Sequence, residues 1–330
     1  MSLSLSGGRV VVTGGAGFIG AHLVESLLVR GAAVTVIDDL STGSLANLDS
    51  CLADIDFVEG DICDPNVAAV VSDAEMVLHL AVRNVRASIR DPRDNFRVNA
   101  DGTLELLEAM RRGGQGRFVY VSSSEIYGTA VAGEFSETTL PAPTTVYGAG
   151  KLAGELITQA YFRTYGMDTV VIRPFNNYGP RSHFEGDSGE VIPKFILRAL
   201  AGRPLLVHGD GAQTRDFMYV EDTADWLCEL ATSDDLRGGV FNIGYGREVA
   251  VNELARLVLD MTGAGAPVQH VAPRPGDLPR LLADVTLIRK HSEFTPRVGF
   301  EEGLERTVAY FRDLGDPADL LEQERAENWT

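Results

Sequence analysis

"RVVVTGGAGFIG", from Arg9 to Gly20, joins a run of β-branched residues to a glycine-rich turn. The run is typical of a strand that is buried on both faces of a parallel sheet. Gly14, Gly17 and Gly20 recur at every third position, where glycine permits a tight turn and lets backbone amides approach a pyrophosphate. The helix expected after the turn directs its positive N-terminal dipole at the same anion. The stretch therefore predicts a strand, a dinucleotide-binding turn and a helix.

Strand and helix patterns continue to alternate along the chain. Short β-branched runs recur at residues 32–39, 55–62, 76–81, 116–124 and 168–175, and helical patterns lie at 18–31, 102–114 and 151–166. This alternation predicts an α/β fold with a doubly wound parallel sheet, which is a Rossmann domain.

A second, less regular part of the chain begins after Pro174, where glycine and proline become frequent. Residues 223–230 and 238–244 have the patterns of a helix and a strand that return to the sheet. We therefore expect a dinucleotide-binding Rossmann domain at 1–175 plus about 218–243. A smaller mixed α/β substrate-binding domain is expected at about 176–217 plus 244–330.

The composition excludes several classes of partner. The chain has 330 residues and a net charge of −18, which repels nucleic acid and anionic membrane surfaces. Cys51, Cys63 and Cys228 lack metal-type spacing, and an odd number of cysteines argues against a disulfide framework. No signal peptide or apolar run of membrane-spanning length is present. We expect a cytoplasmic protein with no bound metal, no nucleic-acid partner and no membrane association.

Acidic residues follow the second and third predicted strands. Asp38 ends the second strand, where a carboxylate can accept hydrogen bonds from the adenosine ribose, and Asp39 follows it directly. Two carboxylates would repel a 2'-phosphate, so NAD is favoured over NADP. Asp61, after the third strand, is expected near the adenine.

Tyr147 and Lys151 in "TTVYGAGK" are four residues apart and therefore share one face of a helix. A lysine ammonium beside a phenol stabilises the phenolate and lowers the pKa of the tyrosine. The pair thus predicts a tyrosine base acting on a hydroxyl whose carbon loses hydride.

Six segments, "TGGAGFIG", "HLA", "SSSEIYG", "YGAGK", "RPFNNYGP" and "QTRDFMYVED", together resemble the extended short-chain dehydrogenase/reductase family of nucleotide-sugar-modifying enzymes. The resemblance covers nearly the whole chain. It implies that Ser123 and Tyr147 hold the sugar O4, that Lys151 binds the nicotinamide ribose, and that C4 is oxidised transiently. The remaining cofactor contacts that we expect are Phe18, Ile19, Ile62, Leu80 and Ala81. Many relatives form homodimers through the helix that carries Tyr147 and the one around Leu104 to Met110, so a homodimer is expected.

Glu125 places a carboxylate in a run that otherwise predicts a buried strand end. Sugar 4,6-dehydratases that this chain resembles carry the C5 base at this position, whereas 4-epimerases usually have a small or uncharged residue. The structural alternative is a buried glutamate held by backbone amides.

Ser124 departs from many dTDP-glucose 4,6-dehydratases, which carry at this position the aspartate that protonates the departing C6 hydroxyl. UDP-glucuronate decarboxylases also have a Ser-Glu pair and need no such acid. We expect an NDP-hexose 4,6-dehydratase. The alternatives are a UDP-glucuronate decarboxylase, then an NDP-sugar 4-epimerase and, outside enzymes, a dinucleotide-sensing regulatory protein.

The nucleotide-sugar diphosphate requires cations, and guanidinium groups suit phosphate oxygens. By resemblance, Arg215 and Arg274 match the pyrophosphate-binding arginines of the family. The other residues expected to bind substrate are Asn176, Arg181, Lys194 and Asn252.

Overall fold

The computed structural model describes all residues except 1–3, 115, 130–132, 187, 275–277 and 326–330. The strands of the main sheet are β1 (Arg9–Thr13), β2 (Ala33–Asp38), β3 (Asp56–Glu59), β4 (Met76–His79), β5 (Arg117–Val121), β6 (Asp168–Pro174) and β10 (Val240–Ile243). The other strands are β7 (Asn176–Tyr178), β8 (Leu205–His208), β9 (Thr214–Tyr219), β11 (Glu248–Ala250), β12 (Val268–Val271) and β13 (Arg280–Leu281).

The helices of the first half are α1 (Phe18–Val29), α2 (Pro65–Ala68), α3 (Val85–Arg90), α4 (Pro92–Phe96), α5 (Thr103–Gly113) and α6 (Val146–Tyr165). Those of the second half are α7 (Val191–Leu200), α8 (Val220–Thr232), α9 (Val251–Thr262), α10 (Phe300–Asp313) and α11 (Pro317–Leu321). Two further short helical turns bear on the site, η4 (Arg97–Gly102) and η5 (Ser124–Ile126).

The main sheet, as far as the structure describes it, has seven parallel strands in the order β10-β6-β5-β4-β1-β2-β3. The chain runs outward from β1 to β3 and then crosses back to β4, so the strand order reverses between β1 and β4. Ligands of such sheets bind at the carboxyl ends of the strands beside this reversal. The predicted Rossmann fold is confirmed, and the strand at 240–243 returns to its edge as expected.

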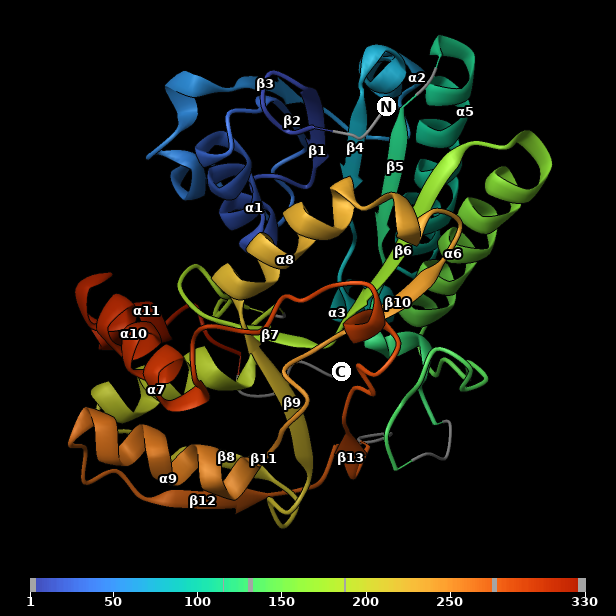
Figure 1. The fold of residues 1–330 in the computed structure, drawn as a ribbon. Coiled ribbons are helices and arrows are strands. Elements are labelled where there is room, and N and C mark those ends of the chain that lie inside the picture. The colour runs from blue at the N-terminus through green and yellow to red at the C-terminus, as the bar shows by residue number, and fades with distance from the viewer. Residues whose placement is uncertain (1–3, 115, 130–132, 187, 275–277, 326–330) are drawn as a thin grey trace.

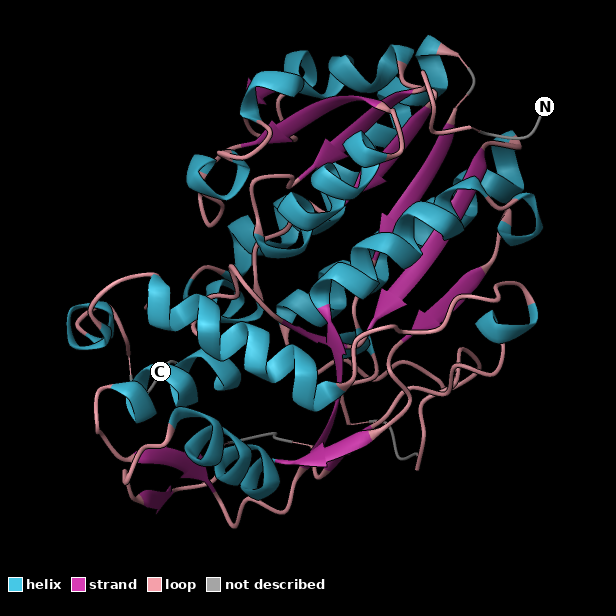
Figure 2. Ribbon diagram, turned by 60° about the vertical axis from the view of Figure 1, so that its left-hand side comes forward, coloured by secondary structure: helices cyan, strands magenta, loops and turns pink. Residues whose placement is uncertain are grey.

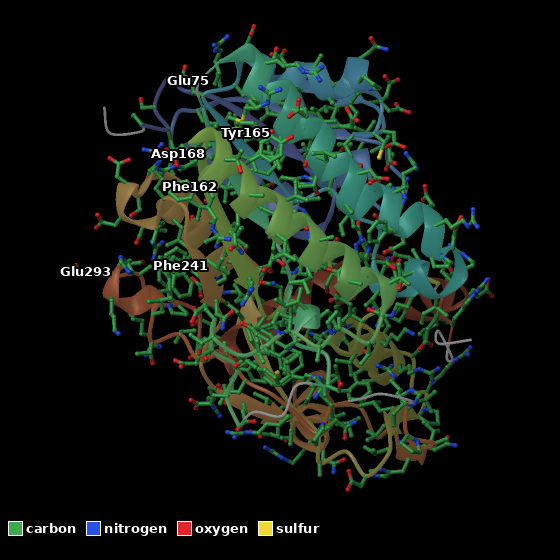
Figure 3. The ribbon with its side chains drawn as sticks, turned by 90° about the vertical axis from the view of Figure 1, so that its right-hand side faces the viewer. Glu75, Phe162, Tyr165, Asp168, Phe241 and Glu293 are labelled. Atoms are coloured by element: carbon green, nitrogen blue, oxygen red, sulfur yellow. The ribbon has the colours of Figure 1, made fainter. Side chains whose placement is uncertain are left out.

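Helices cover both faces of the sheet (Figures 1 and 2). On one face α1 packs against α8, and on the other α5 packs against α6. Strand residues such as Val12 and Val77 are fully buried because each face of the sheet meets a helix layer. Phe162 and Tyr165 mark the end of α6, and Asp168 begins β6 close by (Figure 3).

The second part of the chain lies below the carboxyl ends of these strands (Figure 1). β9 pairs with β7, β11 and β13, and β8 pairs with β12. Helices α7, α9 and α10 share an apolar core with these strands, in which Leu197, Leu254 and Phe300 are buried. No helix among the described residues is both long and apolar enough to cross a membrane.

Candidate functional site

A cavity with a volume of about 310 Å³ lies at the carboxyl ends of the main sheet. Its walls include the residues predicted to bind cofactor or act in catalysis, which are Gly14, Gly17, Phe18, Ile19, Gly20, Asp38, Asp39, Asp61, Ile62, Leu80, Ala81, Ser123, Ser124, Glu125, Tyr147 and Lys151, as well as Asn176. The fold thus brings together residues that follow β1 to β6 and residues of α6, which are far apart in the sequence.

The turn after β1 fits a pyrophosphate. Gly14 has a φ of +74°, and a Cβ there would lie 2.6 Å from the backbone nitrogen of Ala81. A Cβ on Gly20 would collide with the carbonyl oxygen of Gly14. The missing side chains therefore let α1 pack closely and leave its amino end open to the cavity, as dinucleotide binding requires.

Asp38 is held by the backbone at the end of β2. Its two carboxylate oxygens accept hydrogen bonds from the amides of Ala16 and Leu40, both at 2.9 Å. Burial raises the pKa of Asp38 above its usual value, although both amide hydrogen bonds oppose the shift. The side chain is therefore fixed in the position that a ribose-binding carboxylate requires.

Asp39 is ion-paired, which its sequence context did not indicate. Arg83 lies 2.7 Å from the Asp39 carboxylate and also donates to Ser41. Burial works to raise the pKa of Asp39, but the hydrogen bonds from Arg83 and Ser41 and the charge of Arg83 together outweigh it, so the pKa is lowered. Because Arg83 neutralises Asp39, repulsion of a 2'-phosphate rests mainly on Asp38.

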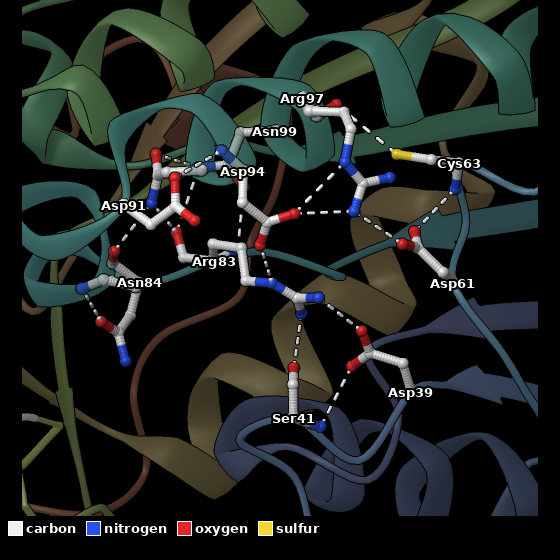
Figure 4. A network of polar contacts seen from close by, with 12 residues as sticks. Asp39, Ser41, Asp61, Cys63, Arg83, Asn84, Asp91, Asp94, Arg97 and Asn99 are labelled. Atoms are coloured by element: carbon white, nitrogen blue, oxygen red, sulfur yellow. Dashed lines mark hydrogen bonds and ion pairs between the residues drawn. The ribbon is translucent and has the colours of Figure 1, made fainter.

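The Asp39–Arg83 pair begins a chain of alternating charges beside the cavity (Figure 4). Arg83 also contacts Asp94 at 2.9 Å, Asp94 pairs with Arg97 at 2.7 Å, and Arg97 pairs with Asp61 at 2.8 Å. The chain links the loops after β2, β3 and β4 to α4 and η4. It therefore holds together the three loops that surround the predicted adenosine site.

Ser123, Glu125 and Tyr147 lie together in the wall of the cavity. Ser123 caps η5 by accepting a hydrogen bond from the amide of Glu125 at 3.2 Å. A hydrogen bond with Ser123 acts to lower the pKa of Tyr147, while the charge of Glu125 acts to raise it.

Thr145 caps α6 by accepting a hydrogen bond from the amide of Gly148, so the helix begins at Val146, just before Tyr147.

Lys151 was expected to lower the pKa of Tyr147, and this expectation is wrong for the groups that the protein itself supplies. Burial raises the pKa of Tyr147 to about 12, and burial lowers the pKa of Lys151 to about 7. The Lys151 ammonium donates to the carbonyl of Val121 at 2.6 Å and lies 4.5 Å from the centre of the Tyr120 ring. Desolvation thus outweighs the pairing inferred from the spacing of four residues.

Glu125 lies in a buried run, as expected, but it is not itself buried. Its side chain is exposed and lines the cavity, whereas its neighbours Ser124 and Ile126 are buried. The short helical turn η5 directs the side chain outward. The alternative of a buried structural glutamate is wrong, because this side chain is exposed.

A second cavity, with a volume of about 80 Å³, lies between α7 and β9. It is lined by Lys194, Arg215 and Arg274, as well as Arg198, His208, Gln213 and Glu324. Arg215 donates to the carbonyls of Thr214 and Leu278, which fixes its guanidinium. Three of the predicted substrate-binding cations therefore meet in one place.

The C-terminal segment also reaches this cavity. Arg198 pairs with Glu324 at 2.9 Å, and the Lys194 ammonium donates to the carbonyl of Arg325 at 2.6 Å. Burial lowers the pKa of Lys194 to about 8. Lys194 is thus anchored beside the cavity by the end of the described chain.

Two of the predicted substrate-binding residues line neither cavity in the part of the chain that the structure describes. Arg181 forms an ion pair with Glu25 of α1, with contacts of 2.7 and 3.0 Å. Asn252 is exposed and donates to the carbonyl of Asp210 at 2.8 Å. Both side chains bind groups that are far from them in the sequence, so the sequence did not indicate these contacts.

Sequence reasoning missed several residues in the wall of the first cavity, namely Ser41, Thr42, Gly43, Arg83, Asn84, Phe175, Asn177, His183 and Glu190. Asn84 donates to the hydroxyl of Ser188 at 2.7 Å, which brings the loop that carries His183 and Glu190 against the loop after β4. The available signal was the position of Arg83 and Asn84 two and three residues after the "HLA" segment that ends at Ala81. Among the described residues, no group of three or more His, Cys, Asp or Glu side chains could hold a metal.

Comparisons with known proteins agree with this site. Residues 10–244 match the model of the NAD dependent epimerase/dehydratase family. The chain is 40% identical to a dTDP-glucose 4,6-dehydratase of Streptomyces niveus, over 92% of this chain and 93% of that protein. It is 38% identical to a UDP-glucose 4-epimerase of Mycolicibacterium smegmatis, over 92% of this chain and 99% of that protein.

Among solved structures, the dTDP-glucose 4,6-dehydratase DesIV of Streptomyces venezuelae with NAD bound has a TM-score of 0.86 and 35% identity. The match covers 92% of this chain and 97% of that one. The glycine turn, Asp38 and the cavity beside them fit the same cofactor. The chain therefore belongs to the NAD-dependent epimerase/dehydratase family, and its cofactor is NAD.

Proposed function

We propose that the protein is an NDP-hexose 4,6-dehydratase. Bound NAD supplies the acceptor and donor of hydride within each turnover. Tyr147 removes the proton of the sugar O4 hydroxyl as C4 is oxidised, and Ser123 holds the same oxygen. Lys151 binds the nicotinamide ribose. The oxidation makes the neighbouring C5–H bond acidic, because the negative charge left on C5 is delocalised into the C4 ketone.

One observation supports dehydration above 4-epimerisation. The exposed carboxylate of Glu125 lines the cavity with Ser123 and Tyr147 and lies close enough to Tyr147 to influence its pKa. A carboxylate at this place can take the C5 proton. Simple 4-epimerisation uses no such group.

Ser124 is buried and carries no acidic proton for the departing hydroxyl. We propose that Glu125 serves both purposes: it takes the proton from C5 and gives it to the C6 hydroxyl, which leaves as water. One carboxyl then completes the elimination without a net change in its protonation.

In this proposal, the sugar and the diphosphate of the substrate occupy different cavities. The sugar lies beside Glu125, Asn176 and the NAD-binding residues of 1–175 plus about 218–243. The diphosphate lies against Arg215 and Arg274, in the part formed by about 176–217 plus 244–330. Half-buried guanidinium groups favour an anionic ligand despite the strongly negative charge of the whole chain.

We also propose a cytoplasmic homodimer formed through α5 and α6. On α6, Leu156 and Tyr165 are 57% and 54% exposed, so this helix presents apolar surface that a second copy of the chain would cover.

The reaction is tested by incubating the enzyme with separate UDP-, dTDP- and GDP-hexoses and with UDP-glucuronate. Mass spectrometry of the products should show the loss of one water from a hexose. Loss of carbon dioxide from UDP-glucuronate would indicate a decarboxylase, and an unchanged mass with altered C4 stereochemistry would indicate an epimerase. Absence of any turnover would favour a dinucleotide sensor. Tyr147→Phe is the control for chemistry catalysed by this site.

A further inference from the structure

Glu155 is a buried carboxylate with no part in the reaction described so far. It lies on α6 one turn after Lys151, and its side chain is 1% exposed. Its Oε1 accepts hydrogen bonds from the Ser122 hydroxyl at 2.5 Å and from Arg173 Nε at 2.9 Å. Its Oε2 accepts from Arg173 Nη2 at 2.7 Å. The carboxylate is therefore fully engaged by two other elements of the fold.

Arg173 extends these contacts beneath the active site. It lies on β6 and is 5% exposed. Its Nη1 donates to the Tyr127 hydroxyl at 2.9 Å, and that hydroxyl donates to Asn242 of β10 at 2.7 Å. The Glu155–Arg173 pair thus ties α6 to the chain after β5, to β6 and to β10.

Two of the residues joined by these contacts, Ser122 and Arg173, lie in or next to the cavity wall. Ser122 directly precedes Ser123, and Arg173 is followed by Pro174, which lines the cavity. Lys151 is one helical turn from Glu155. The pair therefore connects the two segments whose relative position decides whether Ser123 and Tyr147 can hold the same oxygen.

A buried ion pair is a poor way to stabilise a fold. Taking two charges out of water costs several kcal/mol per ion, and apolar side chains of similar volume often stabilise a protein as well or better. A structural role alone would be met by such side chains at these two positions.

We propose that Glu155 and Arg173 are positioning residues of the catalytic site, which hold the strand end at Ser123 in register with the helix of Tyr147. The carboxylate of Glu155, one helical turn from Lys151, also favours the charged form of that ammonium. The proposal rests on the proposed function only for the C4 oxidation, which dehydratases, epimerases and decarboxylases of this kind share.

The charges around Lys151 support the second half of this role. Its ammonium faces the Val121 carbonyl and the Tyr120 ring, and it also acts on the buried imidazole of His79. Burial lowers the pKa of Lys151, and the carboxylate of Glu155 is the group that opposes the shift. Burial and Lys151 together hold the pKa of His79 far below its usual value, so this imidazole stays neutral and supplies no competing charge.

The test is Glu155→Gln, assayed for C4 oxidation in a single turnover by the absorbance of the reduced nicotinamide. The maximal rate should fall on the order of tenfold to a hundredfold, with little change in the KM for the sugar, because a misplaced hydroxyl slows the chemical step. Loss of the carboxylate lowers the pKa of Lys151 further, so Lys151 loses its proton at lower pH. The pH–rate profile should therefore move to lower pH, which a merely structural role would not cause.

Glu155→Gln leaves Arg173 without its counter-ion, so a folding defect must be separated from a catalytic one. The double variant Glu155→Leu, Arg173→Leu removes both charges and should keep a melting temperature near that of the parent protein. The same loss of rate is expected in this variant. Ser122→Ala keeps the ion pair and deletes only one hydrogen bond, so it should give a smaller loss in a folded protein.

Arg256→Ala is the matched control, because it breaks an exposed ion pair of α9 with Asp260 at 2.9 Å. It should change neither rate nor pH profile. The proposal is overturned if the double variant, or Ser122→Ala where the double variant does not fold, oxidises C4 at the parent rate with an unmoved pH profile. Because the readout is the oxidation, a product other than the dehydrated sugar contradicts the proposed function and leaves this test intact.

Discussion

Replacing Glu125 with glutamine should block the elimination of water but leave the C4 oxidation intact. The side chain is exposed, and the hydrogen bond that holds its residue in η5 uses the backbone amide. The amide side chain has the same shape, so the free energy of unfolding should change by only about 0.5 kcal/mol. The expected defect is therefore chemical.

Elimination should fall by on the order of a hundredfold to ten-thousandfold, the usual effect of removing a general base. That range corresponds to roughly 3 to 5 kcal/mol of activation free energy. The C4 oxidation should persist, since Ser123, Tyr147 and Lys151 are unchanged. The charge of Glu125 helps to raise the pKa of Tyr147, so its removal lowers that pKa. Tyr147 must lose its proton to act as a base, and the rising limb of the oxidation should therefore move to lower pH.

Rapid-quench mass spectrometry in deuterated water measures both steps. The variant should accumulate a 4-keto hexose that neither takes up deuterium at C5 nor loses water. Normal dehydration by the variant would refute the assignment of Glu125 as the base. Loss of the C4 oxidation as well would indicate that Glu125 positions the sugar.

Four other changes test the catalytic base, the cofactor site and the anion site. Tyr147→Phe should keep NAD but slow C4 oxidation by on the order of a hundredfold or more, measured by the absorbance of reduced nicotinamide; an undiminished rate would exclude Tyr147 as the base. Gly20→Ala should abolish NAD binding in calorimetry, because its Cβ collides with the Gly14 carbonyl, and unchanged affinity would contradict the phosphate-binding turn. Asp38→Asn should narrow the preference for NAD over NADP, and an unaltered ratio of dissociation constants would show that Asp38 does not face the ribose. Arg215→Leu should raise the KM for the nucleotide sugar at least tenfold with kcat nearly unchanged, and an effect on kcat alone would place Arg215 outside the diphosphate site.

Local sequence determined the parts of this protein that depend on neighbouring residues. The β-branched run before Gly14 and the regular glycine spacing after it predicted a strand, a turn and a helix, because each rests on backbone conformation over a few residues. The spacing of Tyr147 and Lys151 placed both on one helix face for the same reason. Strand and helix alternation predicted the parallel sheet, and the reversal of strand order then collected the cofactor-binding residues at one edge.

The tertiary structure decided which charges meet. Arg181 contacts Glu25 and Arg83 contacts Asp39, across 156 and 44 positions in the sequence, so no local pattern contains either pair. The exposure of Glu125 and the desolvation that raises the pKa of Tyr147 to about 12 depend on what the folded chain packs around them. Coulomb energy and desolvation depend on distance and surroundings in space, and sequence separation determines neither of them.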